Sequence, residues 1–255
     1  MIYNLYKQRG ETPLECIQRF AKITPELKGK KMTYMGRLDP LAEGVLLMAS
    51  GEDVKRKEEF LGLDKEYDFI SIFGFATDTY DILGKIVRVE KLANLSENEI
   101  RKAALVYEGE REQEYPQYSS KMLSKTSPRF HLDLSSIEER QSANEVKKIT
   151  VHKLQFHGLD ALKSKEFFGR LLMDISKVNG DFRQHEILIL WKEILFKGST
   201  EDKIFLGRFS AHVSSGTYIR SLVNDMGKTL GYGATTLSIR RTRVGDYKIE
   251  DSFKY

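Results

Sequence analysis

The sequence has little cysteine and little proline, with one cysteine, Cys16, and five prolines among 255 residues. A single cysteine cannot form an intramolecular disulfide, and no cysteine or histidine residues stand at zinc-ligand spacing, so we expect neither disulfides nor a structural metal. No segment approaches the roughly 18 apolar residues that a membrane-spanning helix needs, and the first residues lack the pattern of a signal peptide. We therefore expect a cytoplasmic protein with no membrane partner.

The overall composition is that of an ordinary globular protein. Hydrophobic residues make up 40% of the chain and charged residues 31%, which argues against disorder and against a fibrous class. The formal net charge of +4 permits a polyanionic partner without requiring one. Basic residues gather in three stretches, each of which can equally be an ordinary solvated surface, at 28–37, 55–57 and 240–248.

Helices are predicted at three places. Capping boxes of the form Ser/Thr-x-x-Glu open two of them, at 12–15 and at 96–99. A third helix is expected to begin after 214–217, which we read as its cap. In the first helix the predicted buried positions are Leu14, Ile17, Phe20 and Ala21.

Strands are predicted between these helices. The segment 67–75 is rich in aromatic and β-branched residues, and 86–89 is a plausible antiparallel partner across the polar turn 77–84. The segment 205–213 also reads as a strand. Helices and strands mix without a regular βαβ alternation, so the sequence predicts an α+β fold. In the first strand one face is expected to carry Tyr67, Phe69, Phe73 and Phe75.

Two other segments are harder to assign. The stretch 117–150 is polar and has no clear period, so we expect a long mobile loop of the kind that binds ligands. The stretch 185–196 fits both a helical stripe and a buried strand. We favour the helix there.

The segment 36–44 carries the strongest indication of chemistry. It reads Gly-Arg-Leu-Asp-Pro-Leu-Ala-Glu-Gly, and Asp39 within it suits a carboxylate held on a rigid loop, because glycines flank it and a proline follows. Alone, such an aspartate is more often a turn cap. Four further segments follow in order: Lys65-Glu66-Tyr67, Thr-Asp-Thr-Tyr-Asp-Ile-Leu-Gly at 77–84, Pro-Gln-Tyr-Ser-Ser-Lys at 116–121 and Ser-Gly-Thr-Tyr-Ile-Arg-Ser-Leu at 215–222.

These five collinear segments resemble the TruB-type family of tRNA pseudouridine synthases, and the resemblance runs from about Leu5 to Tyr247. It implies the pseudouridine synthase fold, a mixed, mostly antiparallel central sheet with flanking helices and loops. It also implies an isomerase that converts the T-loop uridine of tRNA, position 55, to pseudouridine, with the T-arm of tRNA as partner. The reaction retains all its atoms, so no cofactor or metal is expected.

The resemblance implies three catalytic residues. Asp39 would be the nucleophile on a flipped-out uridine. Arg220 would pair with Asp39 and keep it ionised, and Tyr67 would stack on the base and take part in proton transfer. Each residue also has a plain structural reading, as a turn cap, a surface helix cation or a core tyrosine.

Two further groups have supporting roles. The matching family positions imply substrate-binding roles, for which the residues are Tyr34, Asp81, Tyr218 and Ile239. Basic residues within and outside the three basic stretches are candidates for contacts with the RNA backbone, which position RNA without reading its sequence. These candidates are Lys7, Arg37, Lys121, Arg240 and Arg241.

The sequence departs from the family pattern in several places. Tyr34 stands where the family usually has a histidine that helps to open the RNA loop, and Gln8 stands where a proline usually follows the lysine. The loop after Tyr118 lacks the usual basic continuation. No C-terminal RNA-binding module of the PUA type fits, so we expect one catalytic domain over 1–255. The sequence shows no coiled coil and no exposed apolar stripe, so we expect a monomer. An insertion at about 160–203 interrupts the match, and we expect it to supply some RNA-binding surface.

Two alternative functions stay open. A ribosomal RNA pseudouridine synthase would also place arginine and leucine before the catalytic aspartate, although Pro40 and the segments 77–84 and 218–220 favour the tRNA type. An inactive tRNA-binding or tRNA-folding protein would keep the scaffold without turnover. The joint presence of the three catalytic residues argues against that second alternative.

Overall fold

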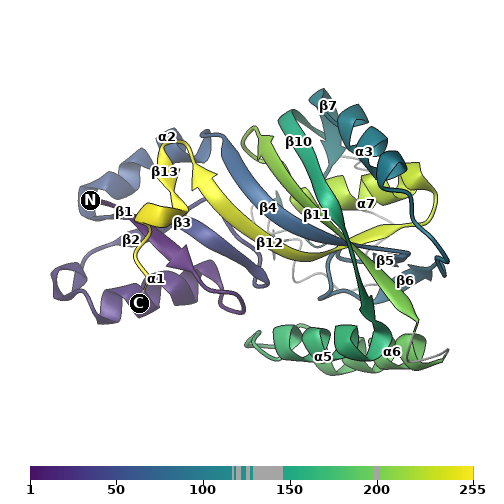
Figure 1. Cartoon of the computed structure of the whole chain (residues 1–255). Coiled ribbons are helices and arrows are strands. Elements are labelled where there is room, and N and C mark those ends of the chain that lie inside the picture. The colour runs from purple at the N-terminus through teal and green to yellow at the C-terminus, as the bar shows by residue number, and fades with distance from the viewer. Residues whose placement is uncertain (117, 119–121, 125–126, 129–145, 198–201, 255) are drawn as a thin grey trace.

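A twisted sheet of nine strands runs the length of the molecule in the computed structural model (Figure 1). The structure describes residues 1–255 apart from 117, 119–121, 125–126, 129–145, 198–201 and 255. Across the sheet the strands are β1 (Ile2–Lys7), β3 (Ala42–Ser50), β12 (Ala234–Val244), β4 (Lys65–Phe73), β11 (Lys203–Val213), β10 (Val146–Lys163) and β7 (Gly109–Glu114), with β2 (Met32–Met35) on β3 and β13 (Tyr247–Lys248) on β12.

Only one of these described strand pairs is parallel, the pair of β12 with β3, and all the others are antiparallel. This mixture of strand directions, together with the helices described below, confirms the predicted α+β class.

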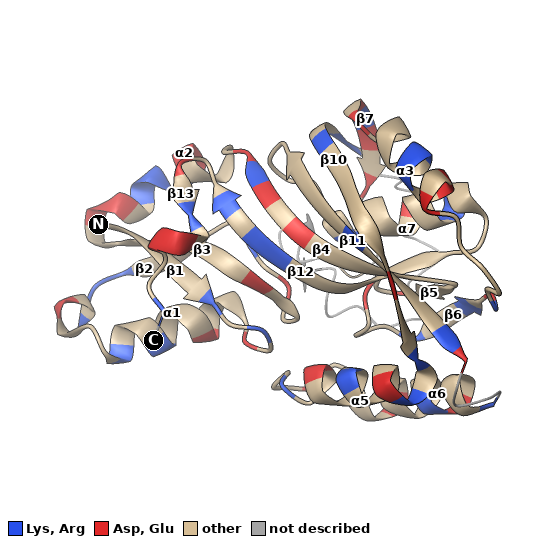
Figure 2. Cartoon of the chain, viewed as in Figure 1, with Lys and Arg blue, Asp and Glu red and all other residues tan. Residues whose placement is uncertain are grey.

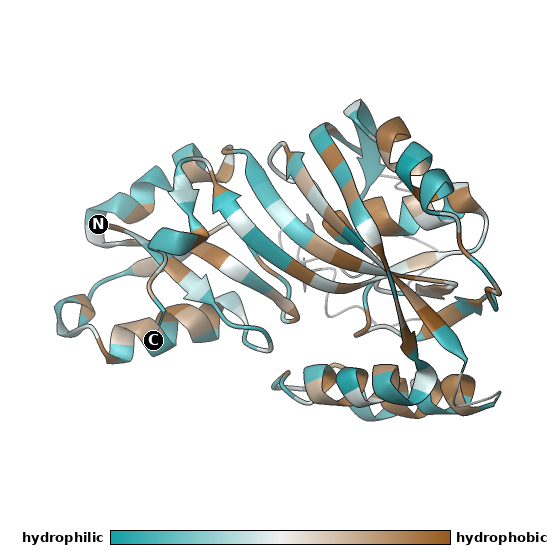
Figure 3. Cartoon of the chain, in the orientation of Figure 1, coloured by the Kyte–Doolittle hydropathy of each residue, from teal (hydrophilic) through white to brown (hydrophobic). Residues whose placement is uncertain are grey.

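Helices cover both faces of the sheet. On one face lie α3 (Glu97–Val106) and α7 (Ile219–Leu230), and on the other lie α5 (Ser164–Ile175) and α6 (Gln184–Phe196). Side chains alternate between the two faces along a strand, and Figure 3 shows both hydrophobic and hydrophilic residues along the strands. On β4, Phe69 therefore packs in the α3 and α7 core, and Ile72 packs in the α5 and α6 core.

The shorter elements lie at the edges of this arrangement. Helix α1 (Pro13–Lys22) packs its buried residues against β1 and β3, and the two chain ends meet nearby, where Phe253 N donates to Asn4 O at 2.9 Å. The remaining elements are α2 (Lys57–Leu61), the strand pairs β5 (Phe75–Thr77) with β6 (Ile86–Val89) and β8 (Met122–Ser124) with β9 (Ser127–Pro128), and the 3₁₀ turns Pro25–Leu27, Gly51–Arg56 and Ile249–Asp251.

Several local predictions are confirmed. The first capping box is complete, because Thr12 Oγ1 accepts from Glu15 N at 3.2 Å and the Glu15 carboxylate accepts from Thr12 N at 2.6 Å. Ser96 Oγ likewise accepts from Glu99 N at 3.4 Å. The segment 185–196 lies within helix α6, as we favoured.

Other local predictions are wrong. Gly74 has a φ of +86° and ends β4, so Phe75 begins a new strand and packs in the α5 and α6 core instead of beside Phe69. Leu14 is 52% exposed. No side chain caps α7, since the Thr217 hydroxyl donates to Ser214 O, inside the preceding turn. Of the predicted loop 117–150, the last five residues belong to β10, and much of the rest lies outside the described residues.

Helices α5 and α6 occupy the predicted insertion at 160–203, between β10 and β11. Those two strands pair antiparallel from Val151 with Val213 to Lys163 with Lys203. A two-residue turn is enough to join antiparallel neighbours, so the sheet itself does not require these helices. In the part of the chain that the structure describes, no helix is long and apolar enough to cross a membrane.

The parallel contact between β3 and β12 brings the chain unusually close at one glycine. Gly44 has a φ of +104°, and a Cβ there would meet Arg241 O at 2.2 Å. We expect Gly44→Ala to lower the free energy of unfolding by about 2 kcal/mol or more, because both the backbone angle and the space exclude a side chain. Urea denaturation would measure this loss.

The matched control is Gly62→Ala. Gly62 has right-handed helical angles, with φ −72° and ψ −14°, and no atom lies within 4 Å of a Cβ built there. We expect a change of less than about 1 kcal/mol. Equal losses in the two variants would contradict the importance of the close approach at Gly44.

Candidate functional site

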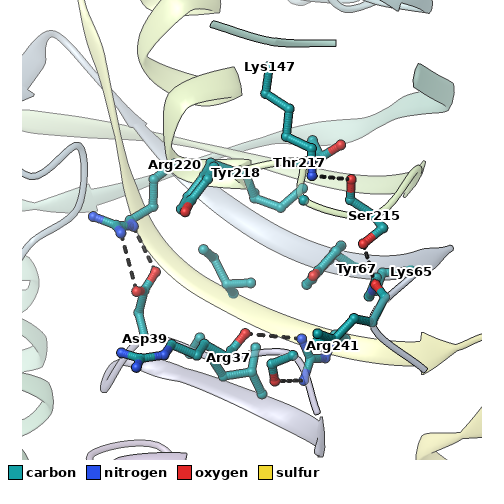
Figure 4. Close-up of a pocket in the computed structure, with 17 residues that line it drawn as sticks. Arg37, Asp39, Lys65, Tyr67, Lys147, Ser215, Thr217, Tyr218, Arg220 and Arg241 are labelled. Atoms are coloured by element: carbon teal, nitrogen blue, oxygen red, sulfur yellow. Dashed lines mark hydrogen bonds and ion pairs between the residues drawn. The ribbon is translucent and has the colours of Figure 1, made fainter. Parts of the chain in front are cut away.

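A pocket of about 330 Å³ opens where the loop before β3, the start of β4 and the N-terminus of α7 meet (Figure 4). That volume lies in the range of small-ligand sites. The loop contributes Asp39, β4 contributes Tyr67, and Arg220 comes from the first turn of α7. Three of the five motif segments therefore meet at one pocket, although they are far apart in the sequence.

Asp39 and Arg220 form a two-point ion pair. Arg220 Nε lies 2.8 Å from Asp39 Oδ2, and Arg220 Nη2 donates to Asp39 Oδ1 at 3.2 Å. The Arg220 side chain is 5% exposed and that of Asp39 is 41% exposed. The guanidinium is thus fixed within the protein while the carboxylate stays accessible from the pocket. This contact is the one that the family resemblance implied.

The 77–84 turn holds the other side of Arg220. Arg220 Nη1 donates to Thr79 O at 2.6 Å, and Asp81 Oδ2 lies 3.7 Å from Arg220 Nε. Asp81 is itself fixed, because its Oδ1 accepts from Thr79 Oγ1 at 2.7 Å and from Leu83 N at 2.9 Å. Asp81 does not line the pocket. It therefore lies behind Arg220 and supports it.

Charge and burial set the titration of this cluster. Burial acts to lower the pKa of Arg220, but the charges of Asp39 and Asp81 outweigh it and raise that pKa above its ordinary value. Burial raises the pKa of Asp81, and the nearby Asp39 charge adds to that rise, against the attraction of Arg220. Arg220 therefore stays cationic, with Asp39 as its closer carboxylate partner.

Two predicted RNA-backbone residues are buried, so the prediction is wrong for them. Lys7 is fully buried, and its Nζ donates to Ala42 O at 2.6 Å and to Pro40 O at 3.1 Å. Arg241 is 1% exposed, and its guanidinium donates to the carbonyl oxygens of three residues, Gly36, Arg37 and Val45, at 2.8–3.2 Å. Both cations hold the loop of Asp39 from inside the protein. A basic residue in the sequence does not reveal whether it faces solvent.

The other predicted site residues lie as follows. Arg37 and Arg240 are exposed, and the Arg37 guanidinium carbon lies 5.8 Å from the centre of the Tyr34 ring. Lys121 lies outside the described residues. Tyr34 is half-buried on β2 and does not line the pocket. The predicted residues that do line the pocket, besides Asp39 and Arg220, are Arg37, Tyr67, Tyr218, Ile239 and Arg241.

The pocket also contains polar residues that sequence reasoning missed. Lys65 Nζ donates to Ser215 Oγ at 3.1 Å, and Lys147 Nζ donates to Ser215 O at 3.0 Å. Burial lowers the pKa of Lys65 to about 8. Lys65 and Ser215 lie in motif segments, so those segments were a signal for them. Lys147 had none, because it lies at the start of β10, within the polar stretch 117–150 that shows no motif and no clear period.

A separate polar cluster lies on the strands beside this pocket. Among the described residues, Asp64, His152 and His212 form one group whose ligand-type atoms all lie within 4.8 Å of one another. Zinc–ligand bonds of about 2.1 Å would require every pair of ligands to lie within about 4.2 Å. In this group His152 Nε2 lies 3.1 Å and His212 Nε2 lies 3.8 Å from Asp64 Oδ2.

Comparison with known proteins gives one family and consistent relatives. A family model described as "TruB family pseudouridylate synthase (N terminal domain)" matches residues 25–168. A tRNA pseudouridine synthase B of Chlamydia felis is 31% identical over 246 residues, which cover 96% of this chain and 82% of that protein. The protein of the same name from Clostridium tetani is 28% identical, and the alignment covers 98% of this chain and 70% of that protein. That from Thermotoga petrophila is 30% identical, and the alignment covers 97% of this chain and 63% of that protein.

Solved structures agree on the fold. A chain from the "Cbf5-Nop10-Gar1 Complex" crystal structure aligns with a TM-score of 0.57 at 21% sequence identity, covering 97% of this chain. The present chain spans about half of that one, 49%. At this identity the likeness establishes the arrangement of helices and strands and nothing finer.

The buried lysine Lys7 should make the free energy of unfolding depend on pH. Burial lowers its pKa from 10.5 to about 8, so between these pH values the unfolded chain binds more protons than the folded protein. The free energy of unfolding of the wild type, relative to Lys7→Met, should therefore rise with pH in this window, by at most about 1.4 kcal/mol per pH unit. Urea denaturation of both proteins at pH 7, 8, 9 and 10 would measure the difference.

The control for this measurement is Lys192→Met, since Lys192 is exposed on α6. It gives the effect of replacing a surface lysine. A wild-type curve that runs parallel to that of Lys7→Met, or falls relative to it, would contradict the prediction.

Proposed function

This chain belongs to the TruB family of pseudouridylate synthases, and on that premise we propose that it isomerises one uridine of tRNA, the T-loop uridine at position 55, to pseudouridine. The relatives named tRNA pseudouridine synthase B support the reaction and the class of substrate. The choice of the T-loop uridine rests on the five motif segments.

The observation that carries this proposal is the accessible carboxylate of Asp39, fixed by a buried arginine at the pocket (Figure 4). Pseudouridine formation breaks the bond between N1 of uracil and C1′ of ribose and joins C5 to C1′, with a proton leaving C5 and one returning to N1. A nucleophile that stays beside the ribose is required while the base turns. Asp39 is the nucleophile, and Arg220 holds it in place through the two-point ion pair.

Tyr67 and Ile239 are the groups that contact the turning base. Both line the pocket with Asp39, and Tyr67 is 8% exposed, so its ring is held firmly. A tyrosine offers a flat face for stacking and a hydroxyl for proton transfer. Tyr218 and Asp81 support the pocket, Tyr218 from its wall and Asp81 from behind Arg220.

A base inside a folded RNA loop has to be extruded before it can react, at a cost of a few kcal/mol. Protein contacts with the RNA backbone have to offset that cost. The cations available for them are Arg37 and Arg240, which are exposed, and Lys147, which lines the pocket and is partly exposed. In this proposal Tyr34, whose ring centre lies 5.8 Å from the guanidinium carbon of Arg37, contacts an unpaired base beside those cations.

Replacement of the nucleophile tests the proposal. Asp39→Asn keeps the size of the side chain and removes its charge, so it should abolish pseudouridine formation while tRNA binding stays within about tenfold of the wild type. The measurement incubates each protein with unmodified tRNA and with unmodified ribosomal RNA, and maps pseudouridines by chemical sequencing. The affinity for tRNA is measured separately at two salt concentrations.

The matched control is Asp246→Asn, at an exposed turn between β12 and β13, which should retain full activity. If the wild type formed pseudouridine in ribosomal RNA and not in tRNA, the substrate would be ribosomal RNA and the proposed substrate would be wrong. Binding of tRNA without any product would make the chain an inactive binding protein. Undiminished product from Asp39→Asn would exclude Asp39 as the nucleophile.

A further inference from the structure

Helices α5 and α6 and the turn between them form the α5–α6 hairpin, residues 164–196. Its apolar side chains share a core with residues of two site segments. Leu41 follows Asp39 in the catalytic loop, and Ile82 and Leu83 belong to the 77–84 turn. All three are at most 7% exposed. From the hairpin this core receives Phe167, Leu171, Ile175, Val178, Ile187, Trp191 and Leu195.

The turn of the hairpin makes a specific contact with the 77–84 turn. Arg183 Nη1 lies 2.8 Å from Asp78 Oδ2, and Arg183 Nη2 lies 3.3 Å from Asp78 Oδ1. Their side chains are only 28% and 17% exposed. Asp78 Oδ1 also accepts from Lys85 N at 2.8 Å. Arg183 therefore binds a carboxylate that closes the base of the turn carrying Thr79 and Asp81.

The backbone on both sides of this contact is constrained. Arg183 has a φ of 63° and Tyr80 a φ of 65°, and among the described residues no other non-glycine has a positive φ. Such angles cost of order 1–3 kcal/mol each and persist where surrounding contacts determine them. The hairpin turn is fixed internally, since Asp181 Oδ1 accepts from Arg183 N at 3.1 Å and the Gln184 amide donates to Gly180 O at 2.7 Å.

The contact continues to the reacting pair through Tyr118. The Arg183 guanidinium lies over the Tyr118 ring, 4.8 Å from its centre. Tyr118 O in turn accepts from Arg220 Nη2 at 3.3 Å, the same nitrogen that donates to Asp39. Arg183 and Arg220 thus hold the same two elements, Tyr118 and the 77–84 turn, from opposite sides.

A second contact joins the hairpin to the catalytic loop. Asp174, on α5, lies 3.0 Å from Arg9 Nη2, and both side chains are 11% exposed. Arg9 donates through Nη1 to Leu41 O at 3.0 Å and through Nη2 to Leu237 O at 2.7 Å. Through Arg9 the hairpin is therefore linked to the backbone on the Asp39 side as well as, through Asp78, to the turn on the Arg220 side.

We propose that the α5–α6 hairpin is a brace that sets the geometry of the Asp39–Arg220 pair, with Arg183 and Asp174 as its positioning residues. This inference rests on the proposed function and adds residues to it that no motif segment contains. We propose this role for the hairpin in place of the RNA-binding surface that we expected at 160–203. Acidic and basic residues alternate along α5 and α6 (Figure 2), whereas a phosphate-binding face needs clustered cations.

The test compares two neutralising substitutions in the hairpin, Arg183→Gln and Lys192→Gln. Both remove one positive charge, but Lys192 is exposed on α6 and distant from the turn that holds Arg183. We expect Arg183→Gln to lower the single-turnover rate of pseudouridine formation about tenfold or more, since small displacements of reacting groups are costly. The affinity for tRNA should stay within about twofold. Lys192→Gln should match the wild type, and Arg183→Lys should recover part of the rate.

Folding and local order are followed without activity. Trp191 is the only tryptophan in the sequence and is fully buried in the hairpin core, so its emission shows whether the hairpin is seated. With that emission unchanged, Arg183→Gln should speed amide hydrogen exchange at Leu83 and Lys85 at least about tenfold, because Asp78 and Asp81 hold those N–H groups. Asp78→Asn should have a similar effect, and the double variant should add little to either.

Each outcome decides between defined alternatives. An unchanged rate and unchanged exchange in Arg183→Gln would overturn the brace. A loss confined to tRNA affinity, with a salt dependence reduced by about one phosphate contact, would make the hairpin an RNA-binding surface instead. A wild type that forms no pseudouridine would refute the proposed function, whereas the hydrogen-exchange result would still report on the brace.

Discussion

The guanidinium of Arg220 is the group whose needs organise the site. It carries a permanent charge and five N–H donors, and its side chain is 5% exposed. Such a buried charge is strongly destabilising unless counter-charges and acceptors surround it. Four groups do so, from the loop of Asp39, the 77–84 turn and Tyr118, namely Asp39, Asp81, Thr79 O and Tyr118 O. Satisfying one cation therefore brings three distant stretches of chain together.

The loop of Asp39 is held in a similar way by other cations, whose N–H groups donate to its backbone. From Gly36, which has a positive φ, to Leu41 the loop forms no helix or strand, and β3 begins at Ala42. Its carbonyl oxygens accept instead from buried cations, Lys7, Arg9 and Arg241. A carboxylate aimed at a substrate needs a backbone that does not shift. These interior hydrogen bonds supply that rigidity without occupying the pocket.

The sequence predicted what short stretches determine and failed where distant contacts decide. The capping box at Thr12 and the strand at 205–213 were read correctly, because hydrogen-bonding side chains and periodicity act locally. Three of the motif segments line the pocket. Each could be recognised for a similar reason, since a motif is defined by residue types and spacing within one short stretch. Lys7 and Arg241 were misread because burial depends on the finished fold, and Phe75 because one residue of positive φ, Gly74, ends β4. Lys147 reaches the pocket only through the pairing of β10 with β7 and β11.

The two kinds of contact made by the α5–α6 hairpin contribute differently. Apolar burial, worth about 1.5–3 kcal/mol for each large side chain, keeps the hairpin on the sheet but tolerates small sliding movements. The partly buried pairs Arg183–Asp78 and Asp174–Arg9 add little net stability, because desolvation offsets their attraction. They do fix the orientation and position of the hairpin relative to the segments that it contacts. If the hairpin shifted, each pair would lose its electrostatic attraction, while its charges would still be partly desolvated. Both pairs end on segments that hold Asp39 and Arg220, so the constraint on position acts on that ion pair.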